Sequence, residues 1–136
     1  MSVAVLDEVG HAGLDTERAS RLFAAALFTL GLDLERIGEV SVALVDSDTI
    51  RDLNSRFRDR DEPTDVLSFE VDGPYGEMAG EVVICPECAD HGMSVDELVV
   101  HGALHLGGME HGEDFGASEM ARLQRAVMEE CRGEES

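Results

Sequence analysis

A segment of eleven residues in the C-terminal third of the chain contains three of its five histidines and constrains its fold most strongly. The histidines follow the spacing H-x3-H-x5-H, at His101, His105 and His111. On a helix, residues four apart share a face, so the first two would lie side by side. Gly107 and Gly108 would end that helix and let the chain turn, so that His111 returns toward the same face. The fold must therefore hold one apolar helix rigidly and bring the following loop back over its end.

Three neutral imidazoles can occupy three corners of a tetrahedron and leave the fourth corner open for water. This is the arrangement of catalytic zinc sites, whereas structural sites are closed by a fourth protein ligand. The alternative is that all three are ordinary helix histidines, but packing alone explains three at this spacing poorly. The pattern therefore predicts one Zn²⁺ per chain, held by His101, His105 and His111.

The spacing also matches the long zincin motif, H-E-x-x-H-x-x-G-x-x-H, at every position but one. Gly102 stands where a metalloprotease has the glutamate that serves as its general base. Glu110 lies beside the last histidine, but nothing in the sequence places it in the missing position. We therefore expect a zinc-like ion at this segment without the standard peptide hydrolysis of zincins.

Length and composition indicate one domain, residues 1–136, since 43% hydrophobic residues suffice for a core. No apolar run approaches the roughly 18 residues of a membrane span, and no basic region followed by an apolar one marks an export signal. Three cysteines, an odd number, also argue against a secreted disulfide framework. The chain is therefore expected to be cytoplasmic and not to bind or span a membrane.

The net charge of −20 is extreme for this length, and all ten positive residues are arginines. Such a chain should repel nucleic acids in general, because non-specific affinity comes from neutralised phosphates. The only concentrated positive segment contains four arginines, diluted by neighbouring acids: Arg51, Arg56, Arg58 and Arg60. A phosphate-facing group is therefore expected in this segment.

Hydrophobic patterning predicts the element order β-α-β-α-β-β-α-α. The strands are expected at 3–6, 40–45, 66–71 and 81–84, and the second of these reads as central. The helices are expected to begin at Asp15, at 46 or 47, at the capping box of Ser94 and Glu97, and at 118. The short connection between the last two strands indicates a hairpin. We predict an α/β fold of the α+β type, with a small mixed four-stranded sheet packed with helices and a zinc site at the start of the C-terminal helical region.

Two long segments together resemble one family, the YbeY-type endoribonucleases. Residues 101–111 are similar to the family's H-G-x-L-H-L-x-G-x-D-H, and residues 53–69 resemble its L-N-x-x-Y-R-x-x-D-x-P-T-D/N-V-L-S-F. Residues 80–85, Gly-Glu-Val-Val-Ile-Cys, are similar to its G-D-I-V-I-C. The departures are mild: Phe57 for tyrosine, Glu110 for aspartate, and Glu70 where proline is common.

The resemblance implies a metal-dependent endoribonuclease that prefers single-stranded RNA. It implies a role in maturation of the 3′ end of 16S rRNA and in ribosome quality control. The expected partners are rRNA and the small ribosomal subunit or its assembly proteins; no DNA is expected. The family's metal ligands fall on His101, His105 and His111, and its functional arginine falls on Arg58. The strong acidity favours a protein partner on the ribosome over autonomous tight RNA binding.

Several roles stay open at this point. Arg58 can present a planar fork to phosphate, or form a surface ion pair with Asp59 or Asp61. Asp65 and Glu110 could orient ligand histidines, although Asp65 could equally cap a turn. Asn54 and Ser68 are interpreted as structural hydrogen-bonding residues. The nucleophile could be water or the RNA 2′-hydroxyl.

Cys85 and Cys88 form a C-x-x-C, which could be a redox pair or half of a metal site. No second C-x-x-C exists, and Pro86 could simply start a helix, so coincidence at a strand end is the favoured interpretation. Two other functions remain as alternatives to the ribonuclease: another zinc-dependent hydrolase, and a non-catalytic ribosome-associated zinc-binding factor.

Overall fold

The structure is a computed structural model and describes residues 1–11, 13–89, 93–109 and 118–134. The predicted order of strands and helices is confirmed, with two short 3-10 helices in addition. The strands are β1 (Ser2–Asp7), β2 (Ile37–Leu44), β3 (Val66–Asp72) and β4 (Met78–Ile84). The helices are α1 (Thr16–Thr29), η1 (Leu34–Arg36), α2 (Ser47–Arg58), η2 (Pro86–Cys88), α3 (Val95–Leu106) and α4 (Glu119–Glu134).

The four strands form one mixed sheet in the order β1-β2-β4-β3. β1, β2 and β4 run parallel, and β3 pairs antiparallel with β4 through the predicted hairpin, so that Ser68 lies opposite Val82. β2 lies between β1 and β4, which confirms its prediction as a central strand. β3 is an edge strand of this sheet.

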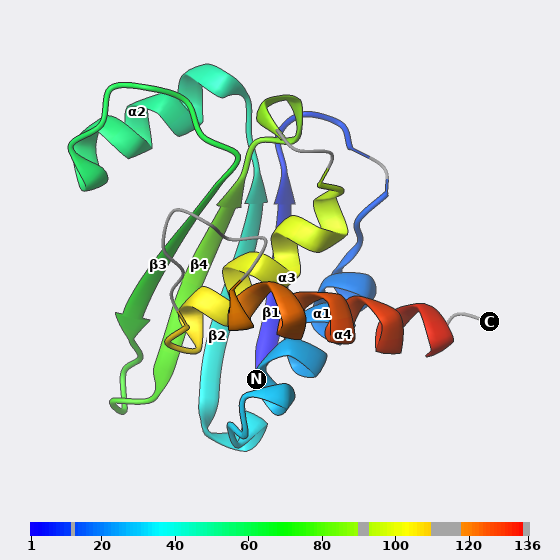
Figure 1. The fold of residues 1–136 in the computed structure, drawn as a ribbon. Helices are drawn as coiled ribbons and strands as arrows, with labels where there is room; N and C mark the ends of the chain where they lie inside the picture. The colour runs from blue at the N-terminus through cyan, green and yellow to red at the C-terminus, as the bar shows by residue number, and fades with distance from the viewer. Residues whose placement is uncertain (12, 90–92, 110–117, 135–136) are drawn as a thin grey trace.

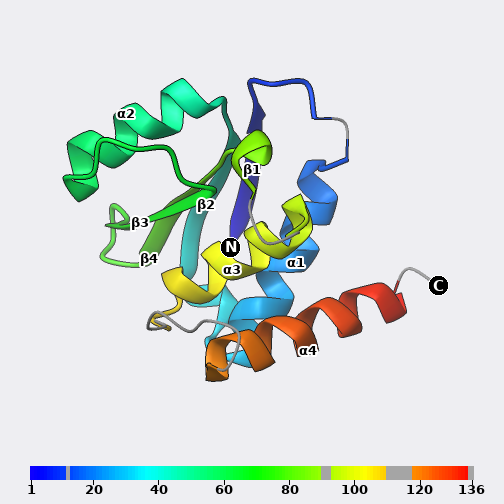
Figure 2. The same ribbon diagram turned by 45° about the horizontal axis from the view of Figure 1, so that its top comes forward.

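Helices cover the two faces of the sheet unequally. α1, α3 and α4 lie on one side, and α2 lies on the other, at one end of the strands (Figure 1, Figure 2). The larger core joins α1, α3 and α4 to the sheet and includes Phe23, Val42 and Leu104. A smaller core under α2 includes Ile50 and Cys85. The predicted sheet packed with helices is therefore confirmed. In the described ranges no helix is long and apolar enough to cross a bilayer.

α3 begins and ends where its sequence signals predict. The Ser94 hydroxyl accepts from the Glu97 backbone N–H at 3.2 Å, and the Glu97 carboxylate accepts from the Ser94 N–H at 3.3 Å, which completes the capping box. The helix ends at Leu106 with Gly107 as its C-cap, and Gly108 turns the chain with a φ of +101°. Apolar residues around most of its circumference are buried, as expected for a helix packed on several sides.

The sheet and α3 approach each other as closely as a glycine allows. A Cβ atom at Gly102 would lie 2.5 Å from Cγ1 of Val82 and 3.3 Å from Oγ of Ser68. The Ser68 hydroxyl donates to the carbonyl of Gly102 at 3.2 Å. This contact sets the distance between the histidine-bearing helix and the β3–β4 hairpin, since no side chain fits between them.

α2 is capped at both ends. At its start the Asp46 carboxylate accepts from the Thr49 N–H at 2.8 Å. At its end Asp59 adopts the left-handed conformation, with φ of 58°. The buried Asn54 donates its amide to the Glu62 carbonyl at 2.8 Å and so holds the chain reversal that follows the helix. Its structural hydrogen-bonding role thus matches the interpretation from the sequence.

Candidate active site

His101 and His105 lie on successive turns of α3 and face each other. Their Nε2 atoms are 3.2 Å apart, and the rings meet edge to face with centroids 4.8 Å apart. His101 is buried, with 7% of its surface exposed, and His105 is half-buried. The i,i+4 spacing therefore places both rings at one point on the helix, as predicted.

The other ring nitrogens are held by acceptors. Nδ1 of His105 lies 2.9 Å from the backbone oxygen of Met109, which can only accept, so this nitrogen carries the proton. Nδ1 of His101 lies 3.0 Å from Oε1 of Gln124. In a neutral imidazole the second nitrogen then carries the lone pair. Both Nε2 lone pairs consequently converge on one region beside α3.

Two converging lone pairs at this separation repel each other unless a cation or a proton lies against them. Metal-binding histidines typically donate their other ring N–H to a carbonyl or carboxylate, which fixes the tautomer and the ring orientation. His101 and His105 have this arrangement in full. The donor set therefore fits a divalent cation that favours nitrogen ligands, such as zinc.

His111 and Glu110 lie outside the described residues. Within the described part of the chain, no group of three or more His, Cys, Asp and Glu side chains could hold a metal ion. The structure thus positions two of the three predicted ligands, and the complete three-histidine site stays a prediction.

Gln124 is the residue at this site that the sequence interpretation missed. It is buried, with 4% of its surface exposed, and its Nε2 lies 4.0 Å from the sulfur of Met93. It lies on the apolar stripe of α4, which also contains Met120, Val127 and Cys131. A lone polar residue in such a stripe was the available signal, because buried amides need partners.

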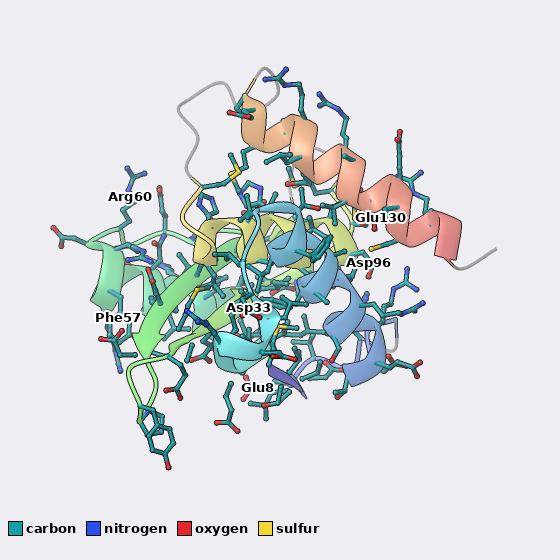
Figure 3. All side chains as sticks on the ribbon, turned by 90° about the horizontal axis from the view of Figure 1, so that it is seen from below. Glu8, Asp33, Phe57, Arg60, Asp96 and Glu130 are labelled. Atoms are coloured by element: carbon teal, nitrogen blue, oxygen red, sulfur yellow. The ribbon has the colours of Figure 1, made fainter. Side chains whose placement is uncertain are left out.

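Arg58 lies at the last turn of α2 and reaches the edge strand β3. Its Nη2 donates to the Ser68 carbonyl at 2.5 Å, and its Cζ lies 5.0 Å from the centroid of the Phe69 ring. Phe69 also contacts Phe57 edge to face, with centroids 5.4 Å apart. Phe57 is 60% exposed, and it projects at the α2 side of the molecule together with Arg60 (Figure 3).

Arg58 also differs from its neighbours in charge pairing. The other three arginines of residues 51–60 form ion pairs: Arg51 with Asp61 at 2.9 Å, Arg56 with Asp52 at 3.1 Å, and Arg60 with Glu62 at 3.8 Å. Among the described residues no carboxylate lies within 4 Å of the Arg58 guanidinium, so the alternative ion pair with Asp59 or Asp61 is not formed. Its positive charge remains available to an anion.

Ser68 connects the two predicted parts of the site. Its carbonyl accepts from Arg58, and its hydroxyl donates to Gly102, the residue after His101. Arg58 and the histidine helix are therefore fixed to the same residue of β3, although they come from distant parts of the sequence. Asp65, just before β3, uses its carbonyl to accept from the Cys85 N–H at 2.9 Å.

A groove of about 780 Å³ lies elsewhere, between β1, β2 and the β3–β4 hairpin. Four acidic residues are part of its lining: Glu39, Asp72, Glu77 and Glu81. Carboxylates repel phosphate, so this groove is a poor site for a nucleic acid backbone.

Comparison with known proteins gives the family. Residues 7–132 match the family model described as "Endoribonuclease YbeY". The chain is 64% identical, over 132 residues, to the endoribonuclease YbeY of Rubrobacter xylanophilus, covering 96% of each sequence. The chain belongs to the YbeY endoribonuclease family. The resemblance that its motifs indicate is therefore confirmed.

More distant YbeY relatives and a solved structure agree. The endoribonuclease YbeY of Corynebacterium efficiens is 35% identical over 150 residues, which cover 94% of this chain and 74% of that protein. The solution structure of TM1509 from Thermotoga maritima has 30% sequence identity and a TM-score of 0.52, covering 97% of this chain and 90% of that one. The sequence matches to the family and the structural match thus cover nearly the whole chain.

Proposed function

We propose that this chain is a zinc-dependent endoribonuclease for single-stranded RNA, formed by one domain over residues 1–136. The observation that carries the proposal is the pair of Nε2 atoms 3.2 Å apart, with both Nδ1 atoms held by acceptors. Membership of the YbeY endoribonuclease family supports the reaction, cleavage of an RNA phosphodiester bond. The proposed task is maturation of the 3′ end of 16S rRNA and ribosome quality control, in the cytoplasm.

In this proposal His101, His105 and His111 hold one Zn²⁺ per chain, and a fourth position is open to water. A bound zinc ion supplies Lewis acidity and lowers the pKa of its water to about 7. The chain's own contribution is orientation. The Met109 carbonyl and the Gln124 side-chain oxygen accept from Nδ1 of the two imidazoles, which leaves both Nε2 lone pairs for the ion that they would hold.

Arg58 has the proposed role of binding the scissile phosphate and stabilising the charge that develops on its oxygens. A guanidinium carries five N–H donors in a planar fork, and the bond to Ser68 occupies only one of them. The ring of Phe69 and the Ser68 carbonyl limit the positions that the guanidinium can adopt. A preorganised donor of this kind is most effective where charge appears in the transition state.

The packing of Gly102 argues against peptide hydrolysis at the same site. The zincin glutamate would need a side chain here, and even a Cβ would collide with Val82 at 2.5 Å. The helix lacks a general base at this position because the position faces the sheet. A phosphodiester substrate, whose charge Arg58 can meet, fits the site better.

The charge of −20 suggests how the RNA arrives. Repulsion between the acidic surface and phosphates weakens binding driven by the RNA backbone alone. We therefore propose that a component of the small ribosomal subunit, or one of its assembly proteins, presents the RNA to the site.

A metal-dependence experiment tests the proposed reaction. Purified protein is assayed for metal content and for cleavage of a defined single-stranded RNA, then stripped with a chelator and reloaded with zinc. We expect about one zinc per chain, loss of cleavage on stripping and recovery on reloading. His105→Ala should lose stoichiometric zinc, whereas the control His11→Ala should retain it. Equal cleavage with and without metal, or cleavage of an unstructured peptide in place of RNA, would contradict the proposal.

Substitution of Arg58 tests its role separately from the metal. Arg58→Ala should retain zinc and its thermal midpoint yet cleave RNA roughly ten- to a thousandfold more slowly, because a transition-state donor is lost. Arg58→Lys should recover only part of the rate, since the compact ammonium group of lysine cannot replace the planar set of N–H donors on the guanidinium. Arg56→Ala is the matched control: it lies on the same exposed turn, but its guanidinium is paired with Asp52. Similar rates for Arg58→Ala and Arg56→Ala would show that Arg58 is an ordinary surface arginine.

A further inference from the structure

Two thiols meet at the end of β4, on the opposite side of the sheet from the histidine pair. Sγ of Cys85 and Sγ of Cys88 are 2.7 Å apart, and both cysteines are free. The residues between them form the short helix η2, in which the Cys88 N–H donates to the Cys85 carbonyl at 3.1 Å. This tight turn, started by Pro86, brings both side chains to the same side of the backbone.

We propose that Cys85 and Cys88 form a reversible disulfide, which makes this turn a redox modification site. The proposal does not depend on the ribonuclease reaction, because neither thiol belongs to the histidine site. The geometry carries it: the sulfur atoms already lie in contact, so closing the bond requires little movement of the backbone.

The described surroundings offer the two thiols neither a third metal ligand nor another cysteine for exchange. In the part of the chain that the structure describes, no third His, Cys, Asp or Glu completes a metal-binding group with the two thiols. Cys131, the remaining cysteine, packs in the larger core with α1, α3 and α4, whereas Cys85 packs in the smaller core under α2. The sheet therefore separates Cys131 from the pair, and exchange between them is blocked.

The two cysteines differ in access, which assigns their order of reaction. Cys85 is fully buried, and Cys88 is half-buried at the rim of the smaller core. Burial, and then the hydrogen bond with Cys88, raise the pKa of Cys85 to about 12, so that it rests as an unreactive thiol. An oxidant from solvent therefore meets Cys88 first.

The reaction balances with a small-molecule disulfide as oxidant. The Cys88 thiolate attacks one sulfur of that disulfide, forms a mixed disulfide and releases the first small thiolate. Cys85 then loses its proton and attacks the Cys88 sulfur, which expels the second small thiolate. Two protein thiols lose two electrons and two protons in total, and the oxidant becomes two thiols.

Helix α2 is the element that this bond would affect. Glu87 lies between the two cysteines, and its carboxylate accepts from the backbone N–H of Ser47, in the first turn of α2, at 2.8 Å. Ile50 of the same helix packs in the core that contains Cys85. A change at η2 is therefore transmitted to the start of the helix whose last turn carries Arg58.

Thiol counting after equilibration with glutathione in graded ratios of its oxidised and reduced forms tests the proposal. Alkylation of the unfolded chain should label three thiols in the reduced form and one in the oxidised form. Before alkylation, the oxidised chain should be lighter than the reduced chain by two hydrogen atoms. Peptide mapping should place the bond between residues 85 and 88, and excess reductant should restore three thiols. Three thiols under every ratio, or a bond that includes Cys131, would overturn the proposal.

Two variants make the test independent of folding defects. Cys131→Ser should lose both of its thiols on oxidation, and Cys88→Ser should keep both of its thiols. Brief alkylation of the folded, reduced wild-type chain should label Cys88 before Cys85. Separately, the rate of amide hydrogen exchange in residues 47–50 should differ between the two redox forms. Loss of both thiols in Cys88→Ser, or labelling of Cys85 first, would contradict the assignment.

Discussion

At the scale of single residues, the nitrogens that point away from the histidine pair determine what the pair can bind. Nδ1 of His101 is held by Gln124, and Nδ1 of His105 by the Met109 carbonyl, so that both Nε2 lone pairs face the same region. The Met109 contact comes from the backbone and withstands substitution. The Gln124 contact depends on a side chain, which makes its contribution measurable.

Replacing Gln124 with alanine should weaken zinc binding about 10- to 100-fold, because a partner that orients a ligand is lost. Gln124→Glu should retain tight binding, since a carboxylate also accepts the Nδ1–H. Competition with a chelating dye measures both affinities. Arg125→Ala, an exposed neighbour on α4, serves as the control. Unchanged affinity in Gln124→Ala would show that His101 needs no partner from α4.

The buried thiol of Cys85 predicts a pH dependence of stability. Its pKa is raised from 9.0 to about 12, so the folded chain retains this proton at pH values where the unfolded chain has lost it. The free energy of unfolding therefore includes a contribution that is complete below pH 9.0 and is lost as the pH rises toward about 12. Urea unfolding of the reduced chain across this range should show the loss, and Cys85→Ala should remove it. An equal decline in both proteins would assign the effect to other groups.

At the scale of elements, the site depends on how α3 and α2 meet the β3–β4 hairpin. α3 reaches it through Gly102, and α2 reaches it through Arg58, with Ser68 in contact with both. Asn54 fixes the chain after α2, and the capping box fixes the start of α3. A shift of either helix by one side-chain layer would break its contact with Ser68.

The substitution Gly102→Ala tests this close approach. The new methyl group would lie 2.5 Å from Val82, and such overpacking costs about 1–3 kcal/mol. Alanine stabilises a helix interior by about 1 kcal/mol relative to glycine, so the net destabilisation should lie between zero and about 2 kcal/mol. Urea unfolding gives the free energy difference.

A second substitution distinguishes collision from other causes. Val82→Ala removes the two methyl groups that a Cβ at Gly102 would meet first. The double variant should therefore be less destabilised than the sum of the two single variants, because the space lost at one residue is regained at the other. Additive effects would place the origin of the destabilisation elsewhere.

At the scale of the whole molecule, the charge distribution distinguishes Arg58 from the arginines around it. The net charge is −20, and the arginines near Arg58 are neutralised by acids within ion-pair distance. The groove beside β1 and β2 is lined with carboxylates. In the proposed function, RNA is therefore repelled by much of the surface and attracted locally at one end of α2.

This distribution predicts an unusual response to salt. Most proteins lose nucleic acid affinity steeply as salt rises, because phosphate contacts release counterions. Here screening also weakens the long-range repulsion, over a Debye length of about 10 Å at 0.1 M salt. Consequently kcat/KM for single-stranded RNA should stay level or rise as NaCl increases from low to physiological concentration. A steep fall, measured at constant zinc content, would contradict this view.

The sequence by itself determined the features that depend on neighbours along the chain. Helix periodicity and caps placed α3 and the shared face of His101 and His105, and the short connection between β3 and β4 predicted the hairpin. The motifs in residues 53–69 and 101–111 sufficed to indicate the family. These features are local, so spacing and backbone preferences are enough to predict them.

Only the tertiary structure decided which distant groups meet. The packing of helices on the sheet creates the hydrogen bond from Nδ1 of His101 to Oε1 of Gln124. It also places Ser68 between Arg58 and Gly102. Among the described residues, the exposure of Phe57 and the lack of a carboxylate beside Arg58 have the same origin. Packing between remote elements is specified by their combined shapes and charges, which no single stretch of sequence contains.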